Sequence, residues 1–222
     1  MAMMRRLCVA TVLAGVGLFL TACAGVPASS ERVLSLHSDI TVQPDGAMAV
    51  RETIKLRSTA KVFRHGIVRE FAGEGADARF LLGDVLLDGQ PAERSTRDIA
   101  GSLRLYIGRE DLPLPPGEHT YTIAFRTGLG VRTEAGLRVL RWNATSDMWP
   151  VPIDAASATV ELPPSVPRDG LPIEAFIGPA HAQKPDGDFH VDGQGRVQFQ
   201  SRRALGIGEG MTVVVSWPAQ TP

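Results

Sequence analysis

Apolar and polar residues alternate with a period of two along most of the chain, and helical periodicity is almost absent. The clearest example is a pair of runs, 33–42 and 47–57, that flank Pro44, Asp45 and Gly46. Proline presets φ and glycine accepts a positive φ, so this tripeptide is typical of a turn between antiparallel strands. The alternation places one side of the hairpin against a core and the other against water.

Similar runs recur downstream and are bounded by Gly, Pro, Asp and Asn. They predict strands at 80–87, 102–107, 120–126, 137–143, 156–162, 173–177, 197–200 and 211–217. About ten short strands with regular turn signals predict an all-β protein, specifically an immunoglobulin-like antiparallel β-sandwich. We expect the stretches 165–171 and 178–195 to be loops.

A glycine turn followed by a strand rich in Thr, Val and Ile occurs twice, at 114–125 and 205–217. One interpretation is a pair of tandem halves with a sub-boundary near 128–131. The other is a single β-sandwich domain over residues 31–218 that uses the same turn before two strands. We favour the single domain, followed by a tail at 219–222.

The N-terminus has the composition of a signal peptide. Arg5 and Arg6 precede an apolar run at 7–20, which is shorter than the roughly 20 residues of a transmembrane helix. The sequence Leu-Thr-Ala-Cys at 20–23 is typical of a lipobox. We expect residues 1–22 to be a lipoprotein signal peptide, Cys23 to carry lipid, and 23–30 to be a tether. The alternative is cleavage after Ala28.

Composition restricts the partners and the chemistry. Cys8 and Cys23 are the two cysteines, so the expected mature domain has neither a disulfide nor a cysteine-based zinc site. Removing Arg5 and Arg6 from a net charge of −1 leaves −3, and no basic stripe indicates nucleic acid. We expect attachment to a membrane through lipid on Cys23, with an envelope protein or glycan as partner. Ala24 in place of aspartate favours the outer membrane in a Gram-negative cell.

Six segments together resemble a known bacterial family. They are ERVLSLHSDI at 31–40, RHGIVREF at 64–71, YIG at 106–108, LPPGEHTYTI at 114–123, RWNAT at 141–145 and WPVPID at 149–154. The chain is similar to the N-terminal extracytoplasmic domain of predicted membrane proteins known as domain of unknown function 2207. The resemblance implies fold and location, and it brings no catalytic residue.

The chain departs from the family pattern in two places. Family members usually continue into transmembrane helices, whereas this sequence ends at Pro222. Lipid on Cys23 would then be the membrane anchor in place of the helices. The segment 70–73 also lacks the aspartate and proline expected around Phe71.

One loop contains side chains suited to a metal. These are His181, Asp186, Asp188, His190 and Asp192. The competing interpretation is a solvated polar loop, because Pro185-Asp186-Gly187 and the run at 192–195 are ordinary turn sequences. We favour the polar loop and predict no metal or other cofactor.

Ser35, His37 and Asp39 share one face of a predicted strand. Successive residues on one face lie about 6–7 Å apart, which is too far for direct hydrogen bonding in a catalytic triad. No Gly-x-Ser-x-Gly motif is present either. We therefore predict no catalytic residue.

Two segments are candidates for binding. Trp142, Asn143 and Trp149 could form an aromatic platform beside rigid prolines, or the tryptophans could belong to the core. Arg64, His65 and Arg69 lie in a basic and apolar stretch at 61–71 that could bind an anionic headgroup or wall polymer. That stretch is equally typical of an edge strand protected by charge, which we favour.

The leading hypothesis is a non-enzymatic, membrane-anchored β-sandwich that binds or assembles with another envelope component. Two alternatives stay open. One is a metal-dependent envelope hydrolase that uses the 181–192 loop, and the other is the sensory ectodomain of a split membrane protein.

Overall fold

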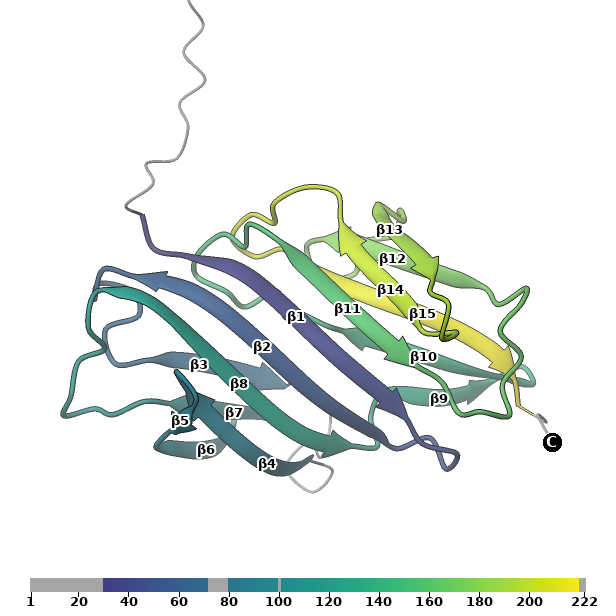
Figure 1. Ribbon diagram of the computed structural model, residues 1–222, viewed down its shortest axis with the longest axis horizontal. Helices are drawn as coiled ribbons and strands as arrows, with labels where there is room; N and C mark the ends of the chain where they lie inside the picture. Colours follow the sequence, from purple (N-terminus) through teal and green to yellow (C-terminus); the bar gives the residue numbers. More distant parts are fainter. Residues whose placement is uncertain (1–29, 72–79, 100, 220–222) are drawn as a thin grey trace, which may run out of the picture.

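The computed structural model describes residues 30–71, 80–99 and 101–219. Cys23, with the predicted signal peptide and most of the tether, lies outside the described residues. The described chain forms fifteen strands in three sheets. Figure 1 shows the largest sheet in front and the two smaller sheets behind it. The predicted all-β sandwich is confirmed, and within the described residues we find no helix that could cross a bilayer.

The largest sheet has eight strands. Their order is β13 (Gly187–Val191), β14 (Val197–Ser201), β11 (Ala156–Glu161), β1 (Arg32–Val42), β2 (Met48–Ser58), β8 (Gly117–Thr127), β4 (Phe80–Leu87) and β5 (Gln90–Pro91). The sheet takes strands from both sides of residues 128–131. Its pairs are antiparallel except β1 with β11, where His37 lies opposite Ser157 in a parallel register.

The two smaller sheets close the other side of the core. One has the order β12 (Ile173–Gly178), β15 (Gly210–Pro218), β10 (Leu137–Asn143) and β9 (Val131–Glu134). The other has the order β3 (Ile67–Phe71), β7 (Ser102–Ile107) and β6 (Arg94–Ile99). Because β3 ends this sheet, the prediction of an edge strand within 61–71 is confirmed.

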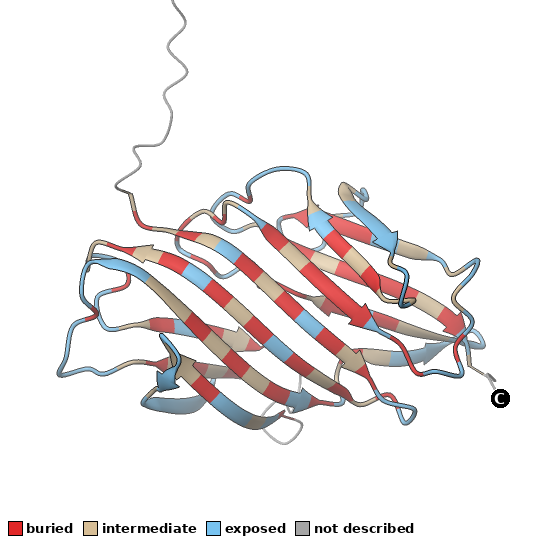
Figure 2. Cartoon of the chain, viewed as in Figure 1, coloured by how far each residue is buried: buried red, intermediate tan, exposed pale blue. Residues whose placement is uncertain are grey.

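The first hairpin forms as its alternation predicts. Leu36, Ile40 and Val42 of β1 are buried, as are the apolar residues at alternate positions of β2. Figure 2 shows the resulting bands of buried and exposed positions along β1, β2 and β8. Near its start β1 contains an irregularity between Val33 and Ser35, so Val33 is buried and Leu34 only half-buried. A β-bulge shifts the inward phase of a strand by one residue, which simple alternation does not anticipate.

An aromatic cluster fills the space between the sheets. Phe71, Phe80 and Phe125 pack with ring centroids 4.5–5.2 Å apart, and Trp142 lies 6.1 Å from Phe125. Such ring pairs contribute about 0.5–1.5 kcal/mol beyond the area they bury. Through this cluster β3, β4, β8 and β10 share one core.

The predicted loop at 178–195 is wrong in part, because residues 187–191 form β13. β13 pairs with β14 at the end of the large sheet, and four of its five residues are exposed. Phe189 and Val191 do alternate with Asp188 and His190, but this run is short and the turn residues on both sides of it dominate the pattern.

Candidate binding site

The structure places both predicted platform tryptophans in the interior. Trp142 is 9% exposed and Trp149 is 4% exposed. The Trp149 indole N–H donates a hydrogen bond to the carbonyl oxygen of Thr145 at 2.8 Å, and Asn143 Oδ1 accepts one from the backbone N–H of Ser146 at 2.9 Å. Trp142, Asn143 and Trp149 therefore build a buried corner of the fold, and no open aromatic platform forms.

The three basic residues of the second segment separate in the structure. Arg69 points into the core, where its guanidinium forms two hydrogen bonds with the carboxylate of Glu52 at 2.6 and 2.7 Å. Arg64 and His65 are exposed, and His65 Nδ1 donates to the carbonyl oxygen of Arg109 at 3.2 Å. Of the three, only His65 lines a cavity.

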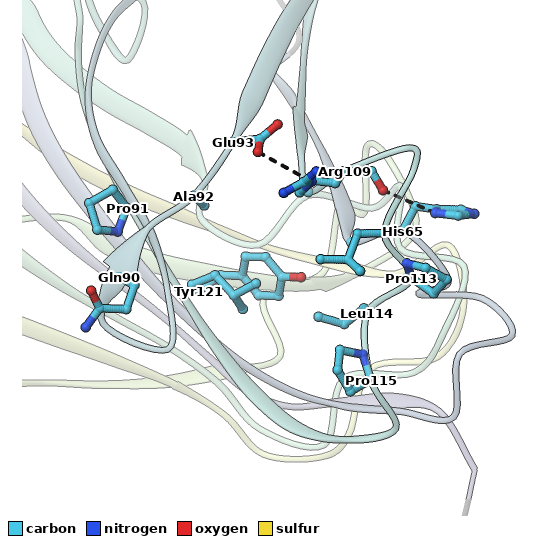
Figure 3. A pocket seen from close by; sticks show the side chains of 14 residues that line it. His65, Gln90, Pro91, Ala92, Glu93, Arg109, Pro113, Leu114, Pro115 and Tyr121 are labelled. Carbon is cyan, nitrogen blue, oxygen red and sulfur yellow. Dashed lines mark hydrogen bonds and ion pairs between the residues drawn. The ribbon is translucent and has the colours of Figure 1, made fainter.

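That cavity is the Tyr121 pocket, a space of about 330 Å³ at one end of the sandwich. It lies between the 65–66 turn, the residues around β5, and the segment at 108–115 that leads into β8. Figure 3 shows prolines and leucine forming much of the wall. The lining includes Leu87, Gln90, Pro91, Ala92, Leu112, Pro113, Leu114 and Pro115. A mostly apolar wall with a few polar groups is characteristic of ligand sites.

Tyr121 supplies a polar group to the lining of the pocket. The residue is fully buried on β8, yet its hydroxyl has no hydrogen-bond partner among the described residues. In Figure 3 the hydroxyl points into the space bounded by Arg109, Pro113 and Leu114. Burial, and then the charge of Asp88, raise the pKa of Tyr121, so the hydroxyl keeps its proton. An unsatisfied buried hydroxyl costs about 1–3 kcal/mol, which a ligand with an acceptor atom would recover.

Charged side chains stand at the rim of the pocket. Arg109 donates to both carboxylate oxygens of Asp111 at 3.0 and 2.7 Å, and its Nε lies 3.4 Å from Glu93 Oε1. Hydrogen bonding to Asp111 and the charges of Asp111 and Glu93 raise the pKa of Arg109. Glu93 and Arg109 also line the cavity, so the rim presents both a cation and an anion to an incoming group.

His119 contacts Pro115, which lines the pocket. Its Nδ1 lies 2.8 Å from Asp88 Oδ2, and its Nε2 lies 2.9 Å from the carbonyl oxygen of Pro115. His119 therefore bridges the Asp88 carboxylate and the carbonyl oxygen of Pro115. Burial opposes ionisation of Asp88, but the hydrogen bonds from His119 and from Thr120 N–H outweigh it and lower its pKa.

Two glycines fix the back of the pocket. Gly66 and Gly108 have φ values of +111° and +136°, which disfavour any other residue. A β-carbon at Gly66 would collide with the carbonyl oxygen of Ile107, and one at Gly108 would collide with that of His65. The close approach of these two turns positions His65 beside Arg109.

On the outer face of the large sheet, Ser157, His37 and Asp39 form a hydrogen-bonded chain. His37 Nδ1 lies 2.7 Å from Ser157 Oγ, and His37 Nε2 lies 3.2 Å from Asp39 Oδ1. The prediction that His37 and Asp39 are too far apart is wrong, because their side chains lean toward each other along β1. Ser157 belongs to β11. This strand pairs with β1 on one side and with β14 on the other, so it is an interior strand of the sheet. The chain lies on an open sheet face and does not line the Tyr121 pocket.

The carboxylates of the 181–192 segment are engaged by arginines. Asp188 pairs with Arg202 and Asp192 with Arg196, while Asp186 lies 3.8 Å from Arg203. His190 is exposed on β13, and His181 lies in a turn with a φ of +64°. In the described part of the chain, no three His, Cys, Asp or Glu side chains gather in a way that could hold a metal ion.

The sequence did not identify Tyr121, Glu93 or Arg109 as site residues. A tyrosine in an alternating strand is indistinguishable from an ordinary core residue, and its unpaired hydroxyl is visible only in three dimensions. The prolines at 113, 115 and 116 were the available signal, because a proline-rich segment before a strand is a frequent wall of a binding groove.

The chain is similar to a known protein of Escherichia coli. A curated relative, the uncharacterized protein YciQ of Escherichia coli, is 23% identical over 200 residues, which cover 87% of this chain and 31% of YciQ. The chain thus spans about a third of that relative's length.

Two solved structures are similar to the chain at low sequence identity. The native leukotriene A4 hydrolase of Saccharomyces cerevisiae has a TM-score of 0.50 and 13% identity, with 83% of this chain and 29% of the hydrolase covered. An M1 zinc metallopeptidase of Deinococcus radiodurans has a TM-score of 0.46 at 16% identity, covering 82% of this chain and 42% of the peptidase. At 13% identity the likeness to the leukotriene A4 hydrolase concerns the fold alone.

The family described as the predicted membrane protein (DUF2207) N-terminal domain matches residues 32–217, nearly the whole described structure. This match confirms the family predicted from the sequence segments. The chain belongs to the family of DUF2207 predicted membrane protein N-terminal domains.

Proposed function

We propose that this domain is a membrane-anchored, extracytoplasmic binding or assembly module, and that the Tyr121 pocket receives part of another envelope component. The observation that carries the proposal is the fully buried, unpartnered Tyr121 hydroxyl in an apolar pocket of about 330 Å³. A pocket with one buried donor and a charged rim is suited to recognition. Its lining residues include no Ser, Thr or Cys that could act as a nucleophile.

The lining indicates the chemistry of the bound group. Prolines, leucines and the tyrosine ring favour an apolar group, and the hydroxyl favours one hydrogen-bond acceptor at its inner end. The paired Arg109 and Glu93 at the rim suit a bound group whose apolar part is followed by a peptide backbone or by other polar atoms. An apolar side chain presented by a partner protein, with a carbonyl nearby, meets these requirements.

Photocrosslinking in intact cells tests this proposal. A photoreactive amino acid at Gln90 or Leu112 lines the pocket, and one at Ile207 is a control that is 69% exposed elsewhere. We expect a specific adduct from the pocket positions, and we expect Tyr121→Phe to weaken it severalfold by removing only the hydroxyl. Equal adducts from Ile207, or an unchanged adduct in Tyr121→Phe, would contradict a pocket-centred function.

The anchor is the second part of the proposal. The family is one of predicted membrane proteins, and the lipobox before Cys23 supplies a means of attachment. We expect Cys23→Ala to abolish lipid labelling and to release the protein from membranes after a high-salt wash. A salt-resistant membrane fraction with a mature terminus at Ser29 would exclude the lipid anchor. Density fractionation of wild-type membranes tests the preference for the outer membrane.

The length of YciQ supports a related form of this proposal. Because the matching region is about a third of that protein, the domain would serve as the ectodomain of a larger membrane assembly. Pull-down with the wild-type pocket and with Tyr121→Phe would show whether a membrane protein is the partner.

A further inference from the structure

A second hollow lies near the Tyr121 pocket, and Gly66 lines both. This groove, of about 320 Å³, runs between the 62–68 segment and residues 148–150. Its lining includes Phe63, Ile67 and Trp149, which are 3–4% exposed, with Phe63 and Trp149 in an edge-to-face contact at 6.4 Å. Three large apolar side chains line it while extending into solvent: Val62 and Val68 at 49% exposed and Met148 at 59%.

The start of β1 is attached to both sides of this groove. Glu31 accepts hydrogen bonds from the backbone N–H groups of Thr59, Lys61, Val62 and Phe63. On the other side, the N–H of Val33 donates to the carbonyl oxygen of Pro152 at 3.0 Å. The chain that leads back from Ser30 to Cys23 therefore departs beside the groove.

The reach of that chain is short. Six residues lie between Cys23 and Ser30, and the seven steps from Cys23 to Ser30 span at most about 25 Å when fully extended. A domain held through Cys23 would keep the groove end within that distance of the lipid surface. Because Ser30 lies at this end of the sandwich, a lipid on Cys23 would hold this end toward the membrane.

The charges around the groove suit a lipid surface that is negatively charged. Lys61 and Arg64 are exposed in the same segment as Val62, and neither has an ion-pair partner among the described residues. Glu70 and Arg104 within the groove neutralise each other at 2.7 Å. Asp147, beside Met148, is half-buried and opposes the two cations in part.

We propose that Val62, Val68 and Met148 insert into the interface of an anionic bilayer, with Lys61 and Arg64 contacting its headgroups. Exposed apolar side chains flanked by cations bind membranes through buried apolar area and electrostatic attraction together. The choice of a bilayer as occupant rests on the anchor in the proposed function, whereas the surface itself is a property of the described domain. Association requires no lipid on Cys23.

Vesicle sedimentation with unlipidated protein tests this proposal. Residues 30–219 contain the fifteen strands and the hydrophobic core of the described chain, so this part is suitable for a test without the lipid. We expect it to bind vesicles in which a third of the phosphatidylcholine is replaced by phosphatidylglycerol, and to bind pure phosphatidylcholine much more weakly. Lys61→Gln and Arg64→Gln should each weaken binding about fivefold. Val62→Asp combined with Met148→Asp should weaken it at least about tenfold.

The matched control is Leu81→Asp, because Leu81 is 71% exposed on β4 and lines a different hollow. It should bind vesicles as the wild type does, and thermal melting should show that each variant folds. No binding by the wild type, or an equal loss in Leu81→Asp, would overturn the proposal. Tyr121→Phe should leave vesicle binding unchanged, so failure of the pocket and failure of this surface are distinguishable.

Discussion

Glu52 and Arg69 form a charged pair in the middle of an apolar core. Their side chains are 0% and 2% exposed, and the guanidinium also donates to the carbonyl oxygen of Glu70 and lies 4.9 Å from the Phe71 ring. Breaking a buried pair leaves one charge without compensation, whereas replacing both partners by apolar residues is often tolerated. The pair fixes β3 against β2 across the two sheets.

We therefore expect Glu52→Leu or Arg69→Met alone to lower the free energy of unfolding by about 3–5 kcal/mol. The double variant should be less destabilised than either single one, because no unpaired charge is left in the core. Urea unfolding of the four proteins measures this coupling. Additive losses in the double variant would show that the two side chains do not act as a pair.

At the scale of single residues, the sequence predicted which side chains are buried better than it predicted which side chains interact. The alternation places Glu52 on the core face of its strand, but Arg69 was grouped with Arg64 and His65 as a candidate binding residue in the basic and apolar stretch at 61–71. The partner of Arg69 lies seventeen positions earlier in another sheet, which no local pattern records. The burial of Trp142 and Trp149 was one of two interpretations, and the structure selects it.

Among the elements, the connection between β2 and β3 depends on one carboxylate. Burial opposes ionisation of Glu31, but hydrogen bonds from Val62, Thr59, Lys61 and Phe63 outweigh it and lower the pKa of Glu31 below its ordinary 4.5. A carboxylate with a lowered folded-state pKa stabilises the fold above the unfolded-state pKa, and this contribution disappears as pH falls through the folded-state pKa.

Glu31→Gln should consequently lower the free energy of unfolding by about 1–3 kcal/mol at about pH 7. The difference from wild type should shrink as the pH falls below 4.5 and through the lowered pKa of Glu31. Chemical unfolding at several pH values checks this, with Glu110→Gln as an exposed control. A difference that does not change with pH would mean that the charge of Glu31 is not what holds the loop.

The strands that the sequence predicted are those that bury one face. β1, β2, β8 and β10 each turn an apolar face to the core and were found from their alternation. β6 and β9 are almost wholly exposed, and their sequences show no clear alternation of apolar and polar residues. β13 is also exposed, and its one short alternation lies among turn residues. The irregular start of β1 was also missed, because a bulge changes which residues of a strand point inward without changing the kinds of residue in it.

For the molecule as a whole, the large sheet joins residues from both ends of the chain. β1 and β2 precede residues 128–131, while β11, β13 and β14 follow them, and β1 lies between β2 and β11. A protein split at this point would expose an open edge on β1 and on β11. Each part would also lose half of the core around Phe125 and Trp142.

We expect residues 30–129 and 130–219, expressed separately, to lack a cooperative unfolding transition. Circular dichroism during heating and proteolysis of each part measure this, with the intact domain as control. Recovery of a sharp transition on mixing the two parts would support the same conclusion. A cooperative transition in either isolated part would instead indicate two independent halves.

The parallel pairing of β1 with β11 also has a consequence for synthesis. His37 and its neighbour Ser157 are 120 positions apart, so the first strand emerges from the ribosome long before its second partner exists. Pairings of such sequence separation form slowly because the intervening loop must close first. One edge of β1 stays unpaired and available to other strands throughout that interval. A nascent chain in this condition exposes an unpaired strand edge and is therefore the form most prone to aggregation.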